Sequence, residues 1–362
     1  MIATEPEVII LEEQDQRSTT SVIVLDEQAP SSTSSVVILD AISDVSEPKN
    51  ASLPVLDGQV PEQLHIGYET FYREQKLGSG GFGVVYKMTS PRGTPIALKV
   101  QHEADYSHFE KIRNEVDIWG RLQHDSIISF LDYKTSYFDR MHYMAMEYAG
   151  HGDLFQFIDK HGDRCPPVFR HRIACQVISA VAFMHGKGFV HCDIKPSNIL
   201  FTDITTVKLC DFGLARPISR DENGIEMKTD VQTGTQHFYT TEKYYGIPTL
   251  ATKDDVWALG VTLLNLAIGQ LPWDTPSAND PLFDLWKCEP LLHPQYCELA
   301  GTDPTFYDLL RNMLDPSEHN RWSMGEVQWS RFVKGEEQQI PQGFNRQPLA
   351  KHLEWSPVHC RI

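Results

Sequence analysis

The residues best suited to chemistry lie in one run, HCDIKPSN, which ends at Asn198, and in the DFG that begins with Asp211. An acid, a base and an amide follow one another within six residues, between apolar stretches on both sides. Asp193 could accept a proton from a hydroxyl nucleophile, and Lys195 could neutralise a phosphoryl group during its transfer. Asn198 and Asp211 offer oxygen ligands of the kind that Mg²⁺ prefers. The alternative interpretation is that these four polar residues lie in unrelated loops and form no common site. Their occurrence in this order along the chain makes that interpretation a poor one.

A glycine-rich run, GSGGFG, contains Gly78, Gly80 and Gly83 and lies between two strand-like stretches. Alone, such a pattern often marks nothing more than a tight hairpin turn. In a dinucleotide-binding fold a helix would follow the glycines directly, but here the strand-like VVYK follows. We therefore interpret the run as a hairpin whose backbone can lie close over phosphates.

Lys99 lies in the middle of the apolar, strand-like run IALKV. An unpaired buried ammonium is costly, so this lysine should have a carboxylate partner in addition to a phosphate. Glu115, in the helical run KIRNEVDIWGRL, is the expected partner. Asp117 competes by proximity but points to another face of the helix. A solvent-facing position for Glu115 is the alternative interpretation.

Two kinds of element have to position these residues, and they follow one another along the chain. Short β-rich runs (YREQKL, GVVYKM and PIALKV) precede a helical pattern at 109–122 and a strand-like run at 142–147. Longer helical patterns then cover residues 167–186, 253–269 and 304–314. This order predicts an α+β domain at residues 65–334, with a small β-rich lobe and a large helical lobe.

The two ends of the chain differ from this domain in composition. Residues 1–64 hold 12 acids and 2 bases and so carry −10 of the net charge of −17. They are rich in Ser, Thr and Pro, and we expect a disordered acidic tail. Residues 335–362 would form a short polar extension. The negative charge argues against direct binding to nucleic acid or to an anionic membrane surface.

The sequence predicts neither a membrane protein nor a secreted one. The longest apolar helix candidate, residues 256–268, is too short to span a bilayer. The N-terminus has neither the basic segment nor the apolar core of a secretion signal. Seven cysteines without CxxC spacing argue against a zinc site, and they fit a reducing compartment. The expected location is the nucleus, the cytoplasm or both.

From about residue 67 to about residue 333 the sequence resembles the eukaryotic protein kinases. The run DVWALG resembles the segment whose first residue, here Asp255, anchors the catalytic loop. Arg321 resembles the late arginine that pairs with the acid ending the activation segment, here Glu242. Lys195 and the Gly-Thr pair ending at Thr235 resemble Ser/Thr kinases, in which the threonine hydroxyl bridges the catalytic aspartate and lysine.

The resemblance implies a site for ATP and Mg²⁺. Asp193 would act as the base, and Lys195 would stabilise the transferred phosphoryl group. Lys99, oriented by Glu115, would hold the α- and β-phosphates, while the metal ligands would be Asn198 and Asp211. Met146 would be the gatekeeper beside adenine. The residues expected along the nucleotide are Gly78, Gly80, Gly83, Val85, Ala97, Lys99, Met146, Glu147, Tyr148 and Asp153.

A narrower resemblance is carried by MEYAGHGDLF at 146–155 and by GQLPWDTPS at 269–277. Both runs are similar to the DNA-damage checkpoint effector kinases of the calmodulin-kinase-like group. This likeness implies a role in a DNA-damage or cell-cycle checkpoint. The stretch after residue 333 is too short for the C-terminal regulatory region that those kinases carry.

Three positions depart from the family pattern. Cys192 replaces the arginine that normally receives a phosphate from the activation loop, so control by phosphorylation of that loop is not expected. Thr240 and Thr241 stand where Ala-Pro is usual, which puts the floor of the protein-substrate site in question. Ser197 replaces a glutamate found in many basophilic kinases, which weakens any expected preference for arginine.

The acidic tail repeats one apolar tetrapeptide pattern three times, at Val8–Leu11, Val22–Leu25 and Val36–Leu39, with a period of 14 residues. At least one acid follows each copy. The pattern resembles SUMO-interacting motifs, in which an extended apolar segment adds a strand to the edge of SUMO and nearby acids meet a basic rim. Extra strands of the domain itself, or aggregation-prone patches, are the alternatives.

Two functions fit these observations. The first is an active protein serine/threonine kinase that uses Mg-ATP and is recruited to SUMO or SUMOylated proteins by its tail. The second is a pseudokinase scaffold that binds SUMO and partners without phosphoryl transfer. The complete set of Lys99, Glu115, Asp193, Asn198 and Asp211 favours the first, since a decayed enzyme usually loses one of them.

Overall fold

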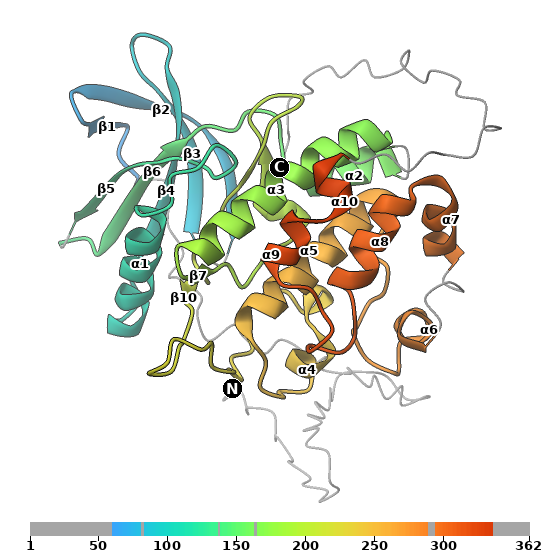
Figure 1. Cartoon of the computed structure of the whole chain (residues 1–362). Helices are drawn as coiled ribbons and strands as arrows, with labels where there is room; N and C mark the ends of the chain where they lie inside the picture. The colour runs from blue at the N-terminus through green and yellow to red at the C-terminus, as the bar shows by residue number, and fades with distance from the viewer. Residues whose placement is uncertain (1–59, 81–82, 137, 163–164, 289–293, 336–362) are drawn as a thin grey trace, which may run out of the picture. The chain divides into compact units, whose positions relative to one another are not determined.

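The computed structural model describes residues 60–80, 83–136, 138–162, 165–288 and 294–335 (Figure 1). The three apolar tetrapeptides of the tail and nearly all of the C-terminal extension lie outside these residues. The described residues form a β-rich part followed by a helical part. The expected α+β architecture, with a small β-rich lobe and a large helical lobe, is thereby confirmed.

The β-rich lobe is one six-stranded antiparallel sheet with a helix, α1, beside it (Figure 1). Its strand order is β1-β2-β3-β4-β6-β5. The elements are β1 (Gln63–Ile66), β2 (Glu69–Gly80), β3 (Gly83–Thr89), β4 (Pro95–His102), α1 (Tyr106–Trp119), β5 (Phe130–Ser136) and β6 (Met141–Glu147).

Strand β4 shows why Lys99 lies where it does. Side chains alternate between the faces of a strand, so Ile96, Leu98 and Val100 share one face. These three belong to the small core of the β-rich lobe. Ala97 faces the opposite way and belongs to the large core that continues into the helical lobe. Lys99 therefore points to the side of the sheet that meets the helical lobe.

The expected boundary between tail and domain, after residue 64, is wrong by a few residues. Gln63 already pairs with Tyr72 in the sheet, and Arg73 donates to the carbonyl of Glu62 through its backbone N–H. Val60 is only 4% exposed and packs into the small core. The ordered domain thus includes residues that we assigned to the acidic tail.

The helical lobe surrounds α5 (Ala251–Ile268), in which almost every side chain is buried. Its other helices are α2 (Leu154–His161), α3 (Pro167–Gly186), α4 (Thr241–Tyr244), α6 (Pro281–Cys288), α7 (Pro294–Thr302), α8 (Pro304–Met313), α9 (Met324–Gln328) and α10 (Arg331–Lys334). Short strands β7 (Phe189–Val190), β8 (Ile199–Phe201), β9 (Val207–Leu209) and β10 (Arg216–Pro217) carry the loops of the site. Of the helices in the described part of the chain, none combines the length and apolarity needed to cross a bilayer.

Candidate active site

The loop from His191 to Lys195 follows β7 and is anchored by a carboxylate from α5. The backbone N–H groups of His191 and Cys192 donate to the two oxygens of Asp255, at 2.8 and 2.9 Å. His185 Nε2 lies 2.9 Å from the same carboxylate. Burial alone would raise the pKa of Asp255, but His185 and the donors of His191 lower it overall. The anchoring role expected for Asp255 is thus confirmed by its contacts.

Asp193, Lys195 and Thr235 form a closed triangle of hydrogen bonds. The Thr235 hydroxyl donates to Asp193 Oδ1 at 2.8 Å and accepts from Lys195 Nζ at 2.9 Å. The Thr235 backbone N–H also donates to Asp193 Oδ1, and Lys195 Nζ lies 2.8 Å from Asp193 Oδ2. Asp193 is thus held in one rotamer by a lysine and a threonine. This bridge is the contact that the Gly-Thr pair predicted.

The two expected metal ligands lie at the same end of a hairpin formed by β8 and β9. Ile199 pairs with Leu209, and the Cys210 N–H donates to the Asn198 carbonyl at 2.9 Å. Asn198 Nδ2 donates to the Asp193 carbonyl oxygen at 2.8 Å, which leaves the amide oxygen for a cation. An amide oxygen and the Asp211 carboxylate suit Mg²⁺, which usually takes one or two protein carboxylates and completes its shell with phosphates and water.

Lys99 reaches both of the acids that it needs. Its Nζ lies 2.7 Å from Glu115 Oε1 and 3.1 Å from Asp211 Oδ1. Burial alone would lower the pKa of Lys99, but Asp211 and Glu115 together raise it, so the side chain stays an ammonium. Asp117 instead pairs with Arg121 on the exposed face of α1. The choice of Glu115 over Asp117 is therefore confirmed.

Helix α1 begins at Tyr106, three residues before the expected start, because Asp105 caps it by accepting from the His108 N–H at 2.9 Å. This start fixes the phase of the helix. Glu115 consequently lies on the buried face together with Ile112 and Ile118.

The glycine-rich run forms the hairpin between β2 and β3, as expected. Gly80 pairs with Gly83, and the two residues between them lie outside the described part of the chain. Gly83 has a φ of 108°, and a Cβ there would lie 2.3 Å from the Val100 carbonyl oxygen. Only glycine fits this position. Gly78 pairs with Val85, so the hairpin begins directly beside the face that carries Lys99.

The apolar residues expected around the nucleotide share that face of the sheet. Val85 lies opposite Lys99, and Ala97 lies opposite Met146. Directly opposed residues in antiparallel strands point to the same side. Val85, Ala97 and Met146 are therefore on the same side of the sheet as the Lys99 ammonium.

Glu147, the last residue of β6, and the segment that follows it make structural contacts that the sequence did not predict. The Glu147 carboxylate binds Lys208 Nζ at 2.8 Å and the hydroxyl of Ser129 at 3.0 Å. It is therefore occupied, and only the backbone of Glu147 could serve a nucleotide. Tyr148 is partly buried against the large core. Asp153 caps α2 by accepting from the Gln156 N–H at 2.8 Å, so one of its oxygens already has a structural role.

The sequence matches the protein kinase domain over residues 71–333. The chain belongs to the protein kinase family. It is 30% identical to the serine/threonine-protein kinase chk-1 of Caenorhabditis briggsae over 88% of this chain and 64% of that protein. It is also 30% identical to the serine/threonine-protein kinase stk11 of Xenopus laevis over 69% of this chain and 58% of that protein.

A plant relative, the LEAF RUST 10 disease-resistance locus receptor-like protein kinase-like 1.4 of Arabidopsis thaliana, is 35% identical over 57% of this chain and 30% of its own length. The chain thus spans less than two thirds of each of these relatives.

The kinase domain keeps the late arginine pair and supplements it with an aspartate that sequence reasoning missed. Arg321 Nη2 lies 3.7 Å from Glu242 Oε2, which confirms the expected pairing. Asp254 accepts from the hydroxyls of Thr240 at 3.0 Å and Thr249 at 2.7 Å, all three side chains being buried. Thr240 also caps α4. Thr240 in place of Ala therefore ties the end of the activation segment to α5 through Asp254, the neighbour of Asp255.

Cys192, the neighbour of Asp193, has an unusual setting. Arg216 Nε lies 3.4 Å from Cys192 Sγ, and Arg216 Nη1 donates to the Thr229 hydroxyl at 3.1 Å. Burial, with Asp255 nearby, raises the pKa of Cys192 to about 11, so the thiol stays protonated. The guanidinium of Arg216 thus binds neutral groups of the protein.

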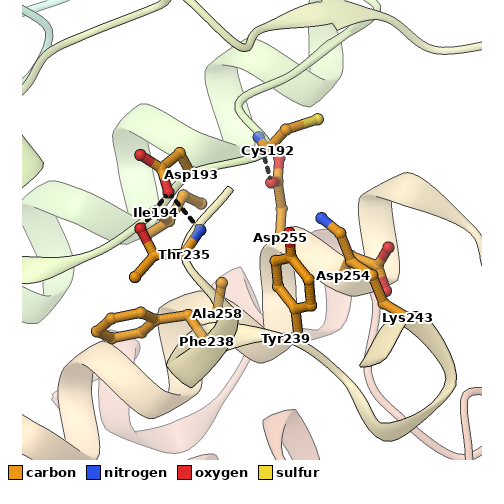
Figure 2. A pocket seen from close by; sticks show the side chains of 10 residues that line it. All are labelled: Cys192, Asp193, Ile194, Thr235, Phe238, Tyr239, Lys243, Asp254, Asp255 and Ala258. Atoms are coloured by element: carbon orange, nitrogen blue, oxygen red, sulfur yellow. Dashed lines mark hydrogen bonds between the residues drawn. The ribbon is translucent and has the colours of Figure 1, made fainter. Parts of the chain in front are cut away.

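A small pocket lies next to Asp193, between the catalytic loop, the segment after Thr235 and the start of α5 (Figure 2). Burial and the nearby Asp193 and Asp254 raise the pKa of Tyr239 to about 12. Its hydroxyl donates to the Gly234 carbonyl at 3.1 Å, and Lys243 lies over its ring. These contacts fix the chain on both sides of Thr235.

Proposed function

We propose that this protein transfers the γ-phosphate of Mg-ATP to serine and threonine hydroxyls of other proteins, and that its N-terminal tail recruits it to SUMO. The observation that carries the first part is the Asp193–Thr235–Lys195 triangle, with Lys99 paired to Glu115 in the same structure. Both arrangements are those of a kinase in which base, phosphate ligand and substrate segment are in place together.

The residues have separable roles in this reaction. Asp193 Oδ2, which faces Lys195 Nζ at 2.8 Å and Asn198 Nδ2 at 3.2 Å, accepts the proton of the attacking hydroxyl, while Oδ1 is held by Thr235. Lys195 balances the charge of the transferred phosphoryl group, and Lys99 holds the remaining phosphates. Asn198 and Asp211 would hold Mg²⁺, which would supply positive charge against the phosphates.

The test is phosphoryl transfer from γ-labelled ATP to a peptide library in which each acceptor is Ser, Thr or Tyr. We expect label on the Ser and Thr peptides and none on the Tyr peptides. Transfer to tyrosine alone would contradict the proposed specificity. The absence of transfer to any peptide or protein would favour the alternative, a pseudokinase scaffold.

The proposal of SUMO recruitment is supported by the three tetrapeptides Val8–Leu11, Val22–Leu25 and Val36–Leu39 and by the net charge of the tail. Fourteen flexible residues have a root-mean-square span of roughly 20 Å, so neighbouring copies could bind successive SUMO groups of a chain. The similarity to chk-1 supports a checkpoint role. A nuclear or cytoplasmic location belongs to the same proposal.

An NMR titration of labelled SUMO with the peptide of residues 1–45 tests this part separately. We expect shifts confined to the edge strand of the SUMO sheet and the basic rim beside it, and none with a peptide whose three tetrapeptides are alanines. If the wild-type peptide leaves those resonances unmoved at millimolar concentration, the tail does not recruit SUMO.

A further inference from the structure

Helix α5 begins without a cap of its own. Leu250, at the cap position, has no side-chain acceptor, although the first N–H groups of a helix need partners. Two glutamates distant in sequence supply them. Glu226 accepts from the Thr252 N–H at 3.0 Å and from its hydroxyl at 2.6 Å, and Glu318 accepts from the Leu250 N–H at 2.7 Å. Carboxylates suit this end of a helix because its dipole is positive there.

Glu226 belongs to the activation segment, between Asp211 and Glu242. It ends a small hairpin in which Arg220 forms a bridge to Glu226, and Asp221 holds the turn by accepting from two backbone N–H groups. Two further contacts follow. Lys228 pairs with Glu318 at 2.5 Å, and the backbones of Thr229 and Thr249 exchange hydrogen bonds of 2.8 and 2.9 Å.

The start of α5 is also where the catalytic loop is anchored. Asp255 holds the loop that carries Asp193, and Asp254 holds Thr240 and Thr249. One end of one helix therefore binds both the catalytic loop and the activation segment that carries Thr235. The contacts at this junction are made by carboxylates, hydroxyls, backbone groups and the ammonium of Lys228.

We propose that Glu226 is a positioning residue: by capping α5 it holds the activation segment where Thr235 can engage Asp193, with no phosphate on the segment. The inference rests on the proposed kinase function. Glu226 is the centre of the arrangement because its carboxylate makes two hydrogen bonds to one residue, whereas Lys228 is largely exposed and its ion pair is worth little.

The test compares full-length Glu226→Ala with Glu222→Ala. Glu222 is an exposed glutamate of the same hairpin, so both variants lose the same charge from the same loop. We expect Glu226→Ala to lower kcat/KM for a protein substrate about tenfold or more, and Glu222→Ala to match the wild type. The KM for ATP should stay within twofold, since the nucleotide residues lie elsewhere.

A double-mutant cycle with Thr252→Val identifies the contact. The pair of substitutions should cost no more than Glu226→Ala alone. Glu226→Gln, which keeps an acceptor oxygen, should fall between wild type and Glu226→Ala, and it serves if the alanine variant does not fold. Wild-type kcat/KM in Glu226→Ala, or full additivity in the cycle, would overturn the inference.

Hydrogen exchange of residues 216–235 separates failure of this inference from failure of the proposed function. Glu226→Ala should exchange faster there than Glu222→Ala, whether or not the protein transfers phosphate. If the wild type has no transferase activity but the exchange difference is found, the kinase proposal fails and the positioning role of Glu226 stands. If exchange in the two variants is equal, the positioning role of Glu226 is refuted.

Discussion

Replacing Glu115 with glutamine should remove the charge of the carboxylate nearest to Lys99 and leave the fold intact. The two side chains are 2% and 8% exposed, and the contact between Lys99 Nζ and Glu115 Oε1 is 2.7 Å long. The amide keeps the shape of the carboxylate and still offers an oxygen, but it carries no charge. Asp211, whose Oδ1 lies 3.1 Å from Lys99 Nζ, then remains as a carboxylate partner and draws the ammonium toward itself.

The size of the effect follows from this geometry. A hydrogen bond to a charged group contributes about 1.5–3 kcal/mol, and breaking a buried ion pair costs about 3–5 kcal/mol. Because Asp211 retains part of the pairing, we expect the substitution to cost about 3 kcal/mol of the free energy by which Lys99 positions the phosphates. That corresponds to a roughly 100-fold fall in kcat/KM for ATP, at about 1.4 kcal/mol for each factor of ten.

The assay is steady-state transfer to a peptide with ATP varied, on wild type, Glu115→Gln and the control Asp117→Asn. Asp117 lies on the same helix, loses the same charge, and has an exposed partner in Arg121. Such exposed pairs contribute little, so the control should stay within about twofold of the wild type. Equal values for wild type and Glu115→Gln would refute the reasoning, as would an equal fall in the control.

Three further predictions concern regulation, recruitment and pH. Protein made in bacteria and treated with phosphatase should keep its activity, because Cys192 cannot bind a phosphate of the activation loop as an arginine would. A large loss of activity that maps to Ser219, Thr229 or Thr233 would contradict this prediction. Replacing one tail tetrapeptide by alanines should barely change binding to single SUMO but weaken binding to a SUMO chain, and added salt should weaken both; equal losses for single and chain SUMO would exclude avidity. The pKa of Asp255 is lowered in the folded protein, so its stabilising contribution should be full above about pH 4 and lost as the pH falls further. The free energy of unfolding of Asp255→Asn should accordingly vary less with pH below 4 than that of the wild type, and an unchanged pH dependence would argue against this role.

The parts of the site that the sequence predicted are those governed by local chemistry. Lys99 had to have an acid because its strand is apolar, and the phase of the following helix selected Glu115 over Asp117. The bridge from Thr235 to Asp193 came with the family resemblance and is present in the structure. The two-lobed fold followed from strands preceding helices.

The contacts that the sequence did not predict are long-range ones made by single polar residues. Asp254, Glu226 and Glu318 lie in no periodic pattern, and a helix capped by a remote carboxylate has no local signature. Strand β1 was missed for a related reason, because QLHI is short and follows an acidic segment. Only its pairing with β2, which buries Val60 nearby, makes it a strand.

The most direct test of the kinase assignment is phosphoryl transfer by Asp193→Asn beside the wild type. Asparagine keeps the size of the side chain and can still accept from Thr235, but it cannot take the proton of a hydroxyl. We predict that transfer to a Ser/Thr peptide falls by roughly 10²–10⁴-fold, the usual contribution of general base catalysis. The dissociation constant for ATP should remain within about twofold. Transfer at the same trace rate by wild type and Asp193→Asn would contradict the assignment and identify the protein as a scaffold.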